Sequence, residues 1–340
     1  MSINFQYLKS ITPGIILALV FCLFSQGINN VLAIEIFSTP KSPISTVLIA
    51  ILLGILMGNA FTPRPGMMIG LDFTQQYILK LGIIFLGIRL SFEELIKFGS
   101  IAIPLIICCI VGVLILVKLL IKKVPISSKM SYLIAIGTSV CGATAIVATA
   151  PVINAKKSEV AYAIANITLF GVIAMIVYPY FAEWYFDNDA LKIGLFLGTS
   201  IHETSQVAAA GLIYDQQFNS PETLNVATVT KLIRNTFLVI LIPLFAFLYN
   251  RGELKGQNYS ILSIFPYFVI GFIGMIVVRN IGDQFFTSNN NAYDLWINLI
   301  GYLKTLATVF LTMAMAAVGI SINLGELKSM GYKPFVVGLI

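Results

Sequence analysis

The sequence predicts an all-α, polytopic membrane protein, a bundle of about ten or eleven transmembrane helices. Of its 340 residues, 58% are hydrophobic and 11% are charged, whereas about 25% of a soluble domain is charged. Mean hydropathy is +0.92. The apolar runs are long and unbroken rather than alternating, which indicates helices and excludes a transmembrane barrel. A bilayer leaves no partner for free backbone groups, so each run must satisfy its own hydrogen bonds as a helix.

The apolar runs are separated by short connections, so we expect residues 1–340 to form a single integral membrane domain. The run that follows Lys9 has no cleavage site and is predicted to be the first helix. The predicted segments are 11–33, 44–61, 76–91, 100–120, 131–154, 160–181, 192–213, 225–249, 260–279, 296–322 and 334–340.

Net charge and cysteine content show which further properties the sequence predicts. The net charge of +6 is explained by basic residues in cytoplasmic loops rather than by nucleic-acid binding. Their distribution over the predicted loops places the N-terminus in the cytoplasm. The four cysteines lie inside apolar segments, which indicates free thiols and no disulfides. No cofactor motif or metal site is predicted, and membrane lipid is the expected surrounding.

Two segments differ from the rest. Residues 137–151 read GTSVCGATAIVATAP, and residues 198–211 read GTSIHETSQVAAAG. Glycine and clustered hydroxyl residues weaken a helix, and the backbone groups that they free need partners. Paired interrupted segments of this kind indicate the binding site of a transporter. The sequence leaves open whether the two segments cross the membrane or enter and leave it as re-entrant hairpins.

A short internal similarity indicates duplication. LGIRLSFEEL at 86–95 resembles VGISINLGEL at 318–327, and each stretch ends a hydrophobic segment. If every segment crosses, the two stretches have opposite orientation. The sequence therefore predicts inverted repeats.

Six basic residues lie inside predicted helices and need a reason, because a charge at bilayer depth is costly. Lys80, Lys118 and Lys304 lie near segment ends, where they are expected to snorkel, and three remain. Lys231 and Arg234 are three residues apart and share a helix face. We predict that they form a seat for an anion, since arginine offers a fork of donors and lysine a mobile charge. Arg89, in the duplicated stretch, is a candidate for gating or anion contact. Snorkelling to the membrane surface is the alternative for all three.

His202, the only histidine, stands next to Glu203 in the second interrupted segment. Such a pair can take up and release protons, so both are candidate proton-coupling residues. The alternative is packing between helices, with His202 hydrogen-bonded and Glu203 paired to a basic residue. Lys231 and Arg234 are the candidate partners of Glu203.

The candidate substrate-binding set combines small residues and donors of both segments with the basic pair. Glycines let backbone N–H groups approach a ligand, although they also permit close helix packing. The set is Gly137, Thr138, Ser139, Cys141, Gly142, Gly198, Thr199, Ser200, His202, Gln206, Lys231 and Arg234.

Three stretches in this order, GTSVCGATAIVATAPVI, GTSIHETSQVAAAG and ATVTKLIRNTFLVILIPL, resemble the signatures of the YeiH-like family of bacterial membrane proteins, which carries the label of sulfate exporter. The similarity extends over nearly the whole chain. It implies an inner-membrane protein with ten or eleven helices. It also implies kinship with antiporter and bile-acid-transporter folds, which have inverted repeats and crossed, broken helices.

We therefore expect a secondary transporter for a small oxyanion such as sulfate, sulfite or a sulfonate, which works as an exporter driven by H⁺ or Na⁺. The alternatives are a sodium-coupled organic-anion carrier and an anion channel. No ATP-binding loop occurs. An intramembrane enzyme with Cys141 and His202 as nucleophile and base is disfavoured, so we expect no enzymatic activity. A homodimer is compatible with the sequence.

Overall fold

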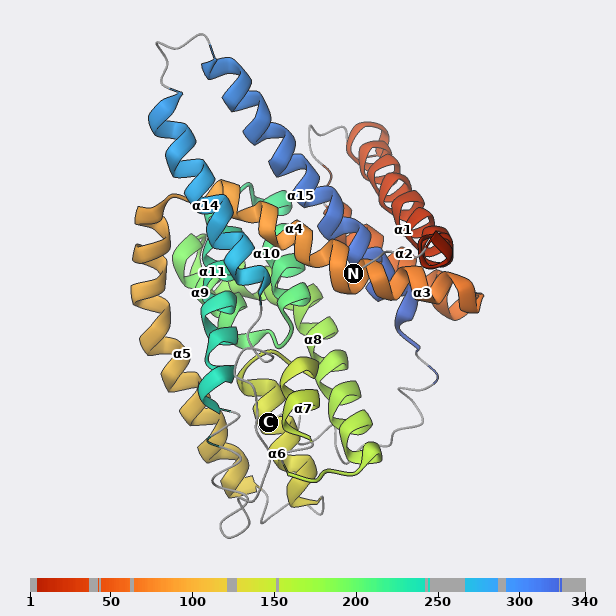
Figure 1. Ribbon diagram of the computed structural model, residues 1–340, viewed down its shortest axis with the longest axis vertical. Helices are drawn as coiled ribbons and strands as arrows, with labels where there is room; N and C mark the ends of the chain where they lie inside the picture. Colours follow the sequence, from red (N-terminus) through yellow and green to blue (C-terminus); the bar gives the residue numbers. More distant parts are fainter. Residues whose placement is uncertain are drawn as a thin grey trace. The chain divides into compact units, whose positions relative to one another are not determined.

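The computed structural model describes residues 5–36, 42, 44–61, 64–120, 127–150, 153–241, 244, 267–286, 292–323 and 325 (Figure 1). All regular elements in these ranges are helices, which confirms the all-α prediction. The segment predicted at 334–340, and most of the second duplicated stretch, lie outside the described residues. The inverted repeat therefore stays a prediction.

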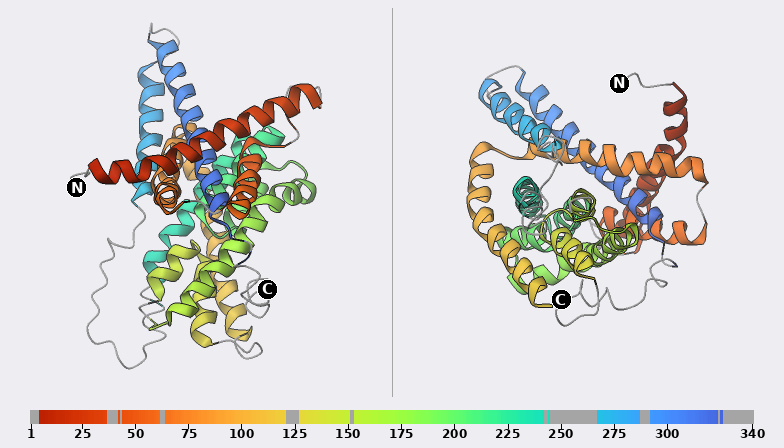
Figure 2. Two further views of the ribbon diagram at one scale, coloured as in Figure 1. Left: turned by 90° about the vertical axis from the view of Figure 1, so that its right-hand side faces the viewer. Right: turned by 60° about the horizontal axis from the view of Figure 1, so that its bottom comes forward.

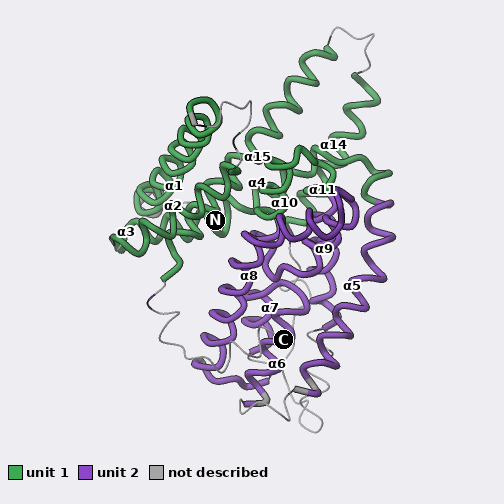
Figure 3. The backbone as a smooth tube through the Cα atoms, turned by 180° about the vertical axis from the view of Figure 1, so that it is seen from behind, with its two compact units in different colours: residues 1–95, 208–225, 268–324 green, residues 96–207, 226–267, 325–340 purple. Residues whose placement is uncertain are grey.

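Two compact units divide the chain, and they interleave along the sequence (Figure 3). Unit 1 comprises residues 1–95, 208–225 and 268–324, and unit 2 comprises residues 96–207, 226–267 and 325–340.

Unit 1 is built around helices from both ends of the chain. Its elements are α1 (Phe5–Val31), η1 (Leu32–Ile36), α2 (Thr46–Ala60), α3 (Pro65–Phe73), η2 (Thr74–Ile78), α4 (Leu79–Leu86), η3 (Gly87–Arg89), α14 (Phe268–Phe285) and α15 (Tyr293–Ser321). Helices α14 and α15 lie side by side (Figure 2), with the Trp296 ring against Gly282. The Trp296 indole donates a hydrogen bond of 2.9 Å to Asp283.

Unit 2 contains the interrupted segments. Its elements are most of α5 (Phe92–Leu120), with α6 (Ser128–Ser139), α7 (Ala143–Thr149), α8 (Lys157–Phe186) and α9 (Ala190–Ser200). Helices α10 (Thr204–Phe218) and α11 (Pro221–Thr236) each have residues in both units.

Seven helices of the described chain are long and apolar enough to cross a membrane. Two further apolar helices, α2 and α9, are shorter. These seven spans correspond to predicted segments one, three, four, six, eight, nine and ten. Segments five and seven are each split into two helices, as the sequence predicted. The chain is thus a multi-pass membrane protein.

The predicted starts of segments three and four are wrong. The third begins at Pro65 rather than at 76, and the fourth at Phe92 rather than at 100. Polar side chains near these starts hid the helices. Gln75, for example, lies inside the span and donates to the Ala317 carbonyl at 3.1 Å and to the Ser321 hydroxyl at 2.7 Å. A side chain paired with α15 need not end a helix.

Small residues let α2 and α15 pack backbone against backbone, as is common between membrane helices. A Cβ atom on Gly58 would lie 2.1 Å from the Ile320 carbonyl oxygen, and one on Gly54 would lie 2.6 Å from that of Ala316. The contact therefore admits no side chain at either glycine.

Gly58→Leu is expected to lower the free energy of unfolding by at least about 1–3 kcal/mol, because the added side chain must push α2 away from α15. The matched control is Gly301→Leu, since a Cβ atom at Gly301 meets nothing within 4 Å. Thermal unfolding in detergent compares the two variants. Equal melting temperatures would contradict the packing.

Candidate functional site

The first interruption lies between α6 and α7. Helix α6 ends at Ser139, and Gly142 directly precedes α7 with φ +65° and ψ −127°, a conformation that glycine alone adopts without strain. The chain then folds back, because a Cβ atom on Gly137 would lie 2.9 Å from the side chain of Ile146. Residues nine apart in one continuous helix would be separated by about 13 Å. Segment five is therefore a helical hairpin.

The second interruption lies between α9 and α10. Helix α9 ends at Ser200, and Ile201 is extended, with φ −83° and ψ 139°. Helix α10 begins again at Thr204, so His202 and Glu203 lie in the interruption itself. Gly198 permits the close approach of α11, since a Cβ atom there would lie 2.6 Å from Cβ of Thr230.

Lys231 of α11 binds carbonyl groups at both interruptions. Its side chain is fully buried. Its ammonium donates to the carbonyls of Val140 at 2.7 Å and Ile201 at 3.0 Å, and also to that of His202. A lysine ammonium has three N–H donors, so all three are used.

Arg234, one turn further along α11, also binds carbonyl groups at both interruptions, through its guanidinium. It is 2% exposed. Nε donates to the Ser139 carbonyl at 2.8 Å, and Nη2 donates to that of Thr138. Nη1 donates to the carbonyls of Thr199 at 2.6 Å and Ile201 at 3.2 Å, and lies 3.5 Å from that of Gly198. Among the described residues one of the five N–H groups, on Nη2, has no acceptor.

These contacts explain why the two cations are buried in the membrane. The last carbonyls of a helix have no partner within it, and a helix C-terminus carries about half a negative charge. Helices α6 and α9 both end beside the basic pair, which supplies hydrogen bonds and opposite charge to both ends. The snorkelling alternative is wrong for Lys231 and Arg234.

Glu203 lies against the turn between α6 and α7. A Cβ atom on Gly142 would lie 2.6 Å from Cγ of Glu203. The carboxylate takes hydrogen bonds from the Ala143 backbone N–H and the Ser205 hydroxyl. It therefore caps the start of α7, and it forms no ion pair within 4 Å with either cation. The predicted pairing of Glu203 with the basic pair is wrong.

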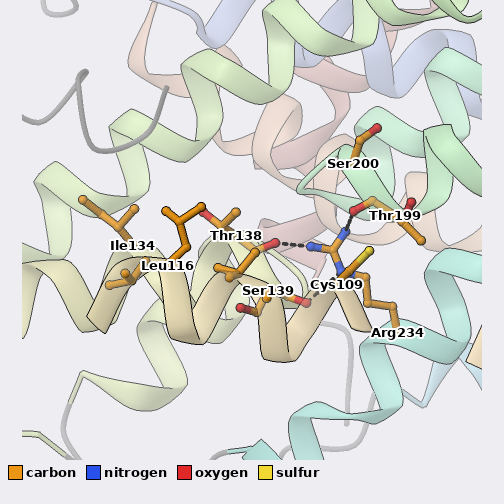
Figure 4. A pocket seen from close by; sticks show the side chains of 11 residues that line it. Cys109, Leu116, Ile134, Thr138, Ser139, Thr199, Ser200 and Arg234 are labelled. Carbon is orange, nitrogen blue, oxygen red and sulfur yellow. Dashed lines mark hydrogen bonds between the residues drawn. The ribbon is translucent and has the colours of Figure 1, made fainter. Parts of the chain in front are cut away.

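A half-open cavity of about 380 Å³ lies within unit 2 between α5, α6, α9 and α11 (Figure 4). Thr138 and Ser139 of the first interrupted segment and Thr199 and Ser200 of the second line it, together with Arg234. The two Gly-Thr-Ser stretches thus meet at one cavity beside a buried cation.

The four hydroxyl groups at the cavity are not equivalent. Ser139, Thr199 and Ser200 donate to carbonyls one turn back in their own helices. The Thr138 hydroxyl makes no hydrogen bond within the described chain. Thr138 and Arg234 are therefore the polar residues at the cavity that keep a donor which no described group takes.

The remaining candidates do not line the cavity. Gly137, Gly142 and Gly198 permit close packing. Gln206, 1% exposed, lies against Gly171 of α8 and donates to the Thr168 carbonyl at 3.3 Å. Neither Lys231 nor His202 presents its side chain to the cavity. Direct ligand contact by Lys231 is not available in this structure, because carbonyls take all its donors.

Cys141 and Arg89 are the last two candidates from the sequence. Cys141 lies in the first interruption, and no hydrogen bond links it to His202. All four cysteines are free, as predicted. Arg89 belongs to unit 1 and forms an ion pair of 2.9 Å with Asp215 of α10. It is not among the residues that line the cavity.

The cavity wall from α5 was missed by the sequence analysis. Cys109, Gly112, Val113, Leu116 and Val117 contribute to it. The signal available was weak: Gly112 and Cys109 share a face of a helix that is otherwise large and aliphatic.

Two interrupted helices whose ends share a buried basic pair, beside a half-open cavity, define a class of multi-pass membrane protein with a cavity at paired helix breaks. Residues 13–338 match the family described as Conserved hypothetical protein 698, and the chain belongs to this family.

Its relatives include a UPF0324 membrane protein of Fusobacterium nucleatum, 34% identical over 89% of this chain and 88% of the relative. A UPF0324 membrane protein of Streptococcus agalactiae is 32% identical, over 97% and 93%. The UPF0324 inner membrane protein YeiH of Escherichia coli is 32% identical, over 87% and 81%. The resemblance to YeiH-like proteins is thereby confirmed. No solved structure matches the chain.

Proposed function

We propose that the protein is a secondary transporter that moves a small oxyanion, such as sulfate, sulfite or a sulfonate, across the bacterial inner membrane. The observation that carries the proposal is the cavity at the two interruptions, where Arg234 and the Thr138 hydroxyl keep free donors. We propose export as the direction, after the label that the YeiH-like family carries, and a cytoplasmic N-terminus, on the basis of the loop charges. The protein is proposed to carry out no enzymatic reaction.

Electrostatics favours an anion as the ligand. The donors at the cavity that no described group takes belong to the Arg234 guanidinium and the Thr138 hydroxyl. A guanidinium N–H and a hydroxyl both donate to the oxygens of an anion, and the hydrogen bond from the charged group is the stronger one.

Protons suit the coupling better than sodium. Sodium would need carbonyl oxygens freed at the helix breaks, and Lys231 and Arg234 already bind these oxygens. Glu203 and His202 can each carry a proton. The Nδ1 atom of His202 is buried and has no hydrogen-bond partner among the described residues. Alternating access would then require movement of the unit that carries the cavity.

Uptake of labelled sulfate, sulfite and methanesulfonate into proteoliposomes, with and without a pH step, tests the proposal. Thr138→Val is expected to lower the uptake of the transported anion at least about tenfold, the equivalent of one lost hydrogen bond to a charged group. Ser139→Ala is the matched control, because its hydroxyl is bonded to the Ala135 carbonyl.

Absence of uptake for every anion, or equal uptake by Thr138→Val and wild type, would exclude the proposed site. Sustained single-channel currents in a planar bilayer would identify a channel instead of a carrier.

A further inference from the structure

The cavity has a polar end and an apolar wall. The free donors, on Thr138 and Arg234, lie together at the ends of α6 and α9, and Figure 4 shows both residues at this end. Away from them the surface is formed by aliphatic side chains of α5 and α6, namely Val113, Leu116, Val117 and Ile134. A ligand that fills the cavity must therefore be charged at one end and apolar along the other.

The volume of the cavity also favours a ligand with an apolar part. A cavity of about 380 Å³ has room for roughly a dozen water molecules. A bare tetrahedral oxyanion would occupy a small part of it and would leave most of its own oxygens facing aliphatic carbon. Desolvation of an anion without compensating hydrogen bonds is costly.

The number of free donors limits the valence of the ligand. Carbonyl groups at the two interruptions already take all donors of Lys231 and all but one of Arg234. With two donors left at the cavity, a dianion would keep more charge without hydrogen bonds in the membrane interior than a monoanion would.

We propose that the site takes a monovalent oxyanion that carries a short apolar body, of the alkanesulfonate or alkanecarboxylate class, in preference to inorganic sulfate. The head group accepts hydrogen bonds from the Thr138 hydroxyl and the free N–H of Arg234. The hydrocarbon body lies along the α5 wall. This inference rests on the proposed transport of an oxyanion and assigns the substrate class of the same cavity.

Binding to the purified protein tests it, with calorimetry in an uncharged detergent. The ligands are inorganic sulfate and the straight-chain sulfonates and carboxylates of one, three and five carbons. Affinity should rise about fourfold for each methylene that enters the cavity. The two head groups distinguish a sulfonate from a carboxylate carrier.

An affinity that rises with ligand chain length can also arise because longer ligands partition into detergent. A variant whose side chain fills the cavity separates this effect from binding in the cavity. Gly112 lines it, and a Cβ atom there meets nothing within 4 Å, so Gly112→Leu is expected to fold. This variant should abolish the dependence on chain length. Gly274→Leu, on the exposed surface of α14 and equally free of contacts, is the matched control and should retain it.

Three results would overturn the inference: sulfate binding as tightly as pentanesulfonate, a flat chain-length series, or a series unchanged in Gly112→Leu. Binding of 1-pentanol that matches pentanesulfonate and is unaffected by Thr138→Val would also overturn it, because the cavity would then accept any apolar chain. If sulfate is transported in a Thr138-dependent manner while the series is flat, this inference alone fails. If no anion is transported, the proposed function fails.

Discussion

Lys231→Met is expected to lower the free energy of unfolding by about 3–5 kcal/mol, even when no anion is present. Methionine keeps much of the side-chain volume but has no donor, so the carbonyls of Val140 and His202 lose their hydrogen bonds. Buried acceptors left without partners are costly. The measurement is thermal unfolding of the purified protein in detergent and anion-free buffer.

Lys80→Met serves as the control. Lys80 also lies in a membrane-spanning helix, but it is exposed and its Nζ lies 5.7 Å from the Tyr77 ring centre. We expect its loss to change stability by no more than about 1 kcal/mol. If Lys231→Met melts like the wild type without anion and differs only when anion is added, then Lys231 is an anion ligand and not a cap for the helix ends.

Glu203→Gln is expected to remove the dependence of uptake on an imposed pH gradient while anion exchange at equal pH continues. Glutamine can still accept the hydrogen bond from the Ala143 N–H, so the start of α7 keeps its cap. It cannot carry a proton. The measurement is uptake into proteoliposomes with and without a pH step, beside counterflow of labelled anion at equal pH.

Asp189→Asn is the matched acid-to-amide control. Asp189 caps α9 through the Lys192 N–H, and asparagine caps equally well. The hydrogen bond and ion pair with the Lys192 side chain hold the pKa of Asp189 below its ordinary value. A carboxyl with a lowered pKa stays ionised near neutral pH, so its loss should leave the pH dependence intact. If Glu203→Gln responds to the pH step as the wild type does, Glu203 does not carry the proton.

The sequence predicted the two helix breaks well, because their cause is local. Gly-Thr-Ser followed by a β-branched residue weakens a helix wherever it stands, and the breaks follow Ser139 and Ser200. It also predicted that both breaks and Arg234 would meet. Backbone groups freed at a helix break need hydrogen-bond partners in the membrane, and a buried cation needs them too.

The partners themselves could not be predicted. Lys231 and Arg234 bind backbone carbonyls, and every residue has one, so residue types carry no signal for this contact. From the sequence Glu203 is a candidate partner of these two cations, but it caps α7 instead. Gln206 was misassigned for a similar reason, because its place against Gly171 depends on the packing of α8 and α10.

The residues of the cavity wall could not be predicted from the sequence either. Val113 and Leu116 of α5 are ordinary apolar residues in a membrane helix, and only the packing of that helix near Arg234 gives them a place at the site. The starts of segments three and four were missed because polar side chains of these spans bond to another helix, as Gln75 does, or to the helix start, as Glu94 does.

The central claim is that Lys231 and Arg234 bind the ends of both interrupted helices and leave Thr138 and one guanidinium N–H for an anion. The most direct measurement is an experimental density map of the protein in lipid nanodiscs without added anion. The account predicts density for the Lys231 ammonium within hydrogen-bonding distance of the carbonyls of Val140, Ile201 and His202. An ammonium that points into the cavity, with α6 or α9 continuing as a regular helix past Ser139 or Ser200, would contradict it.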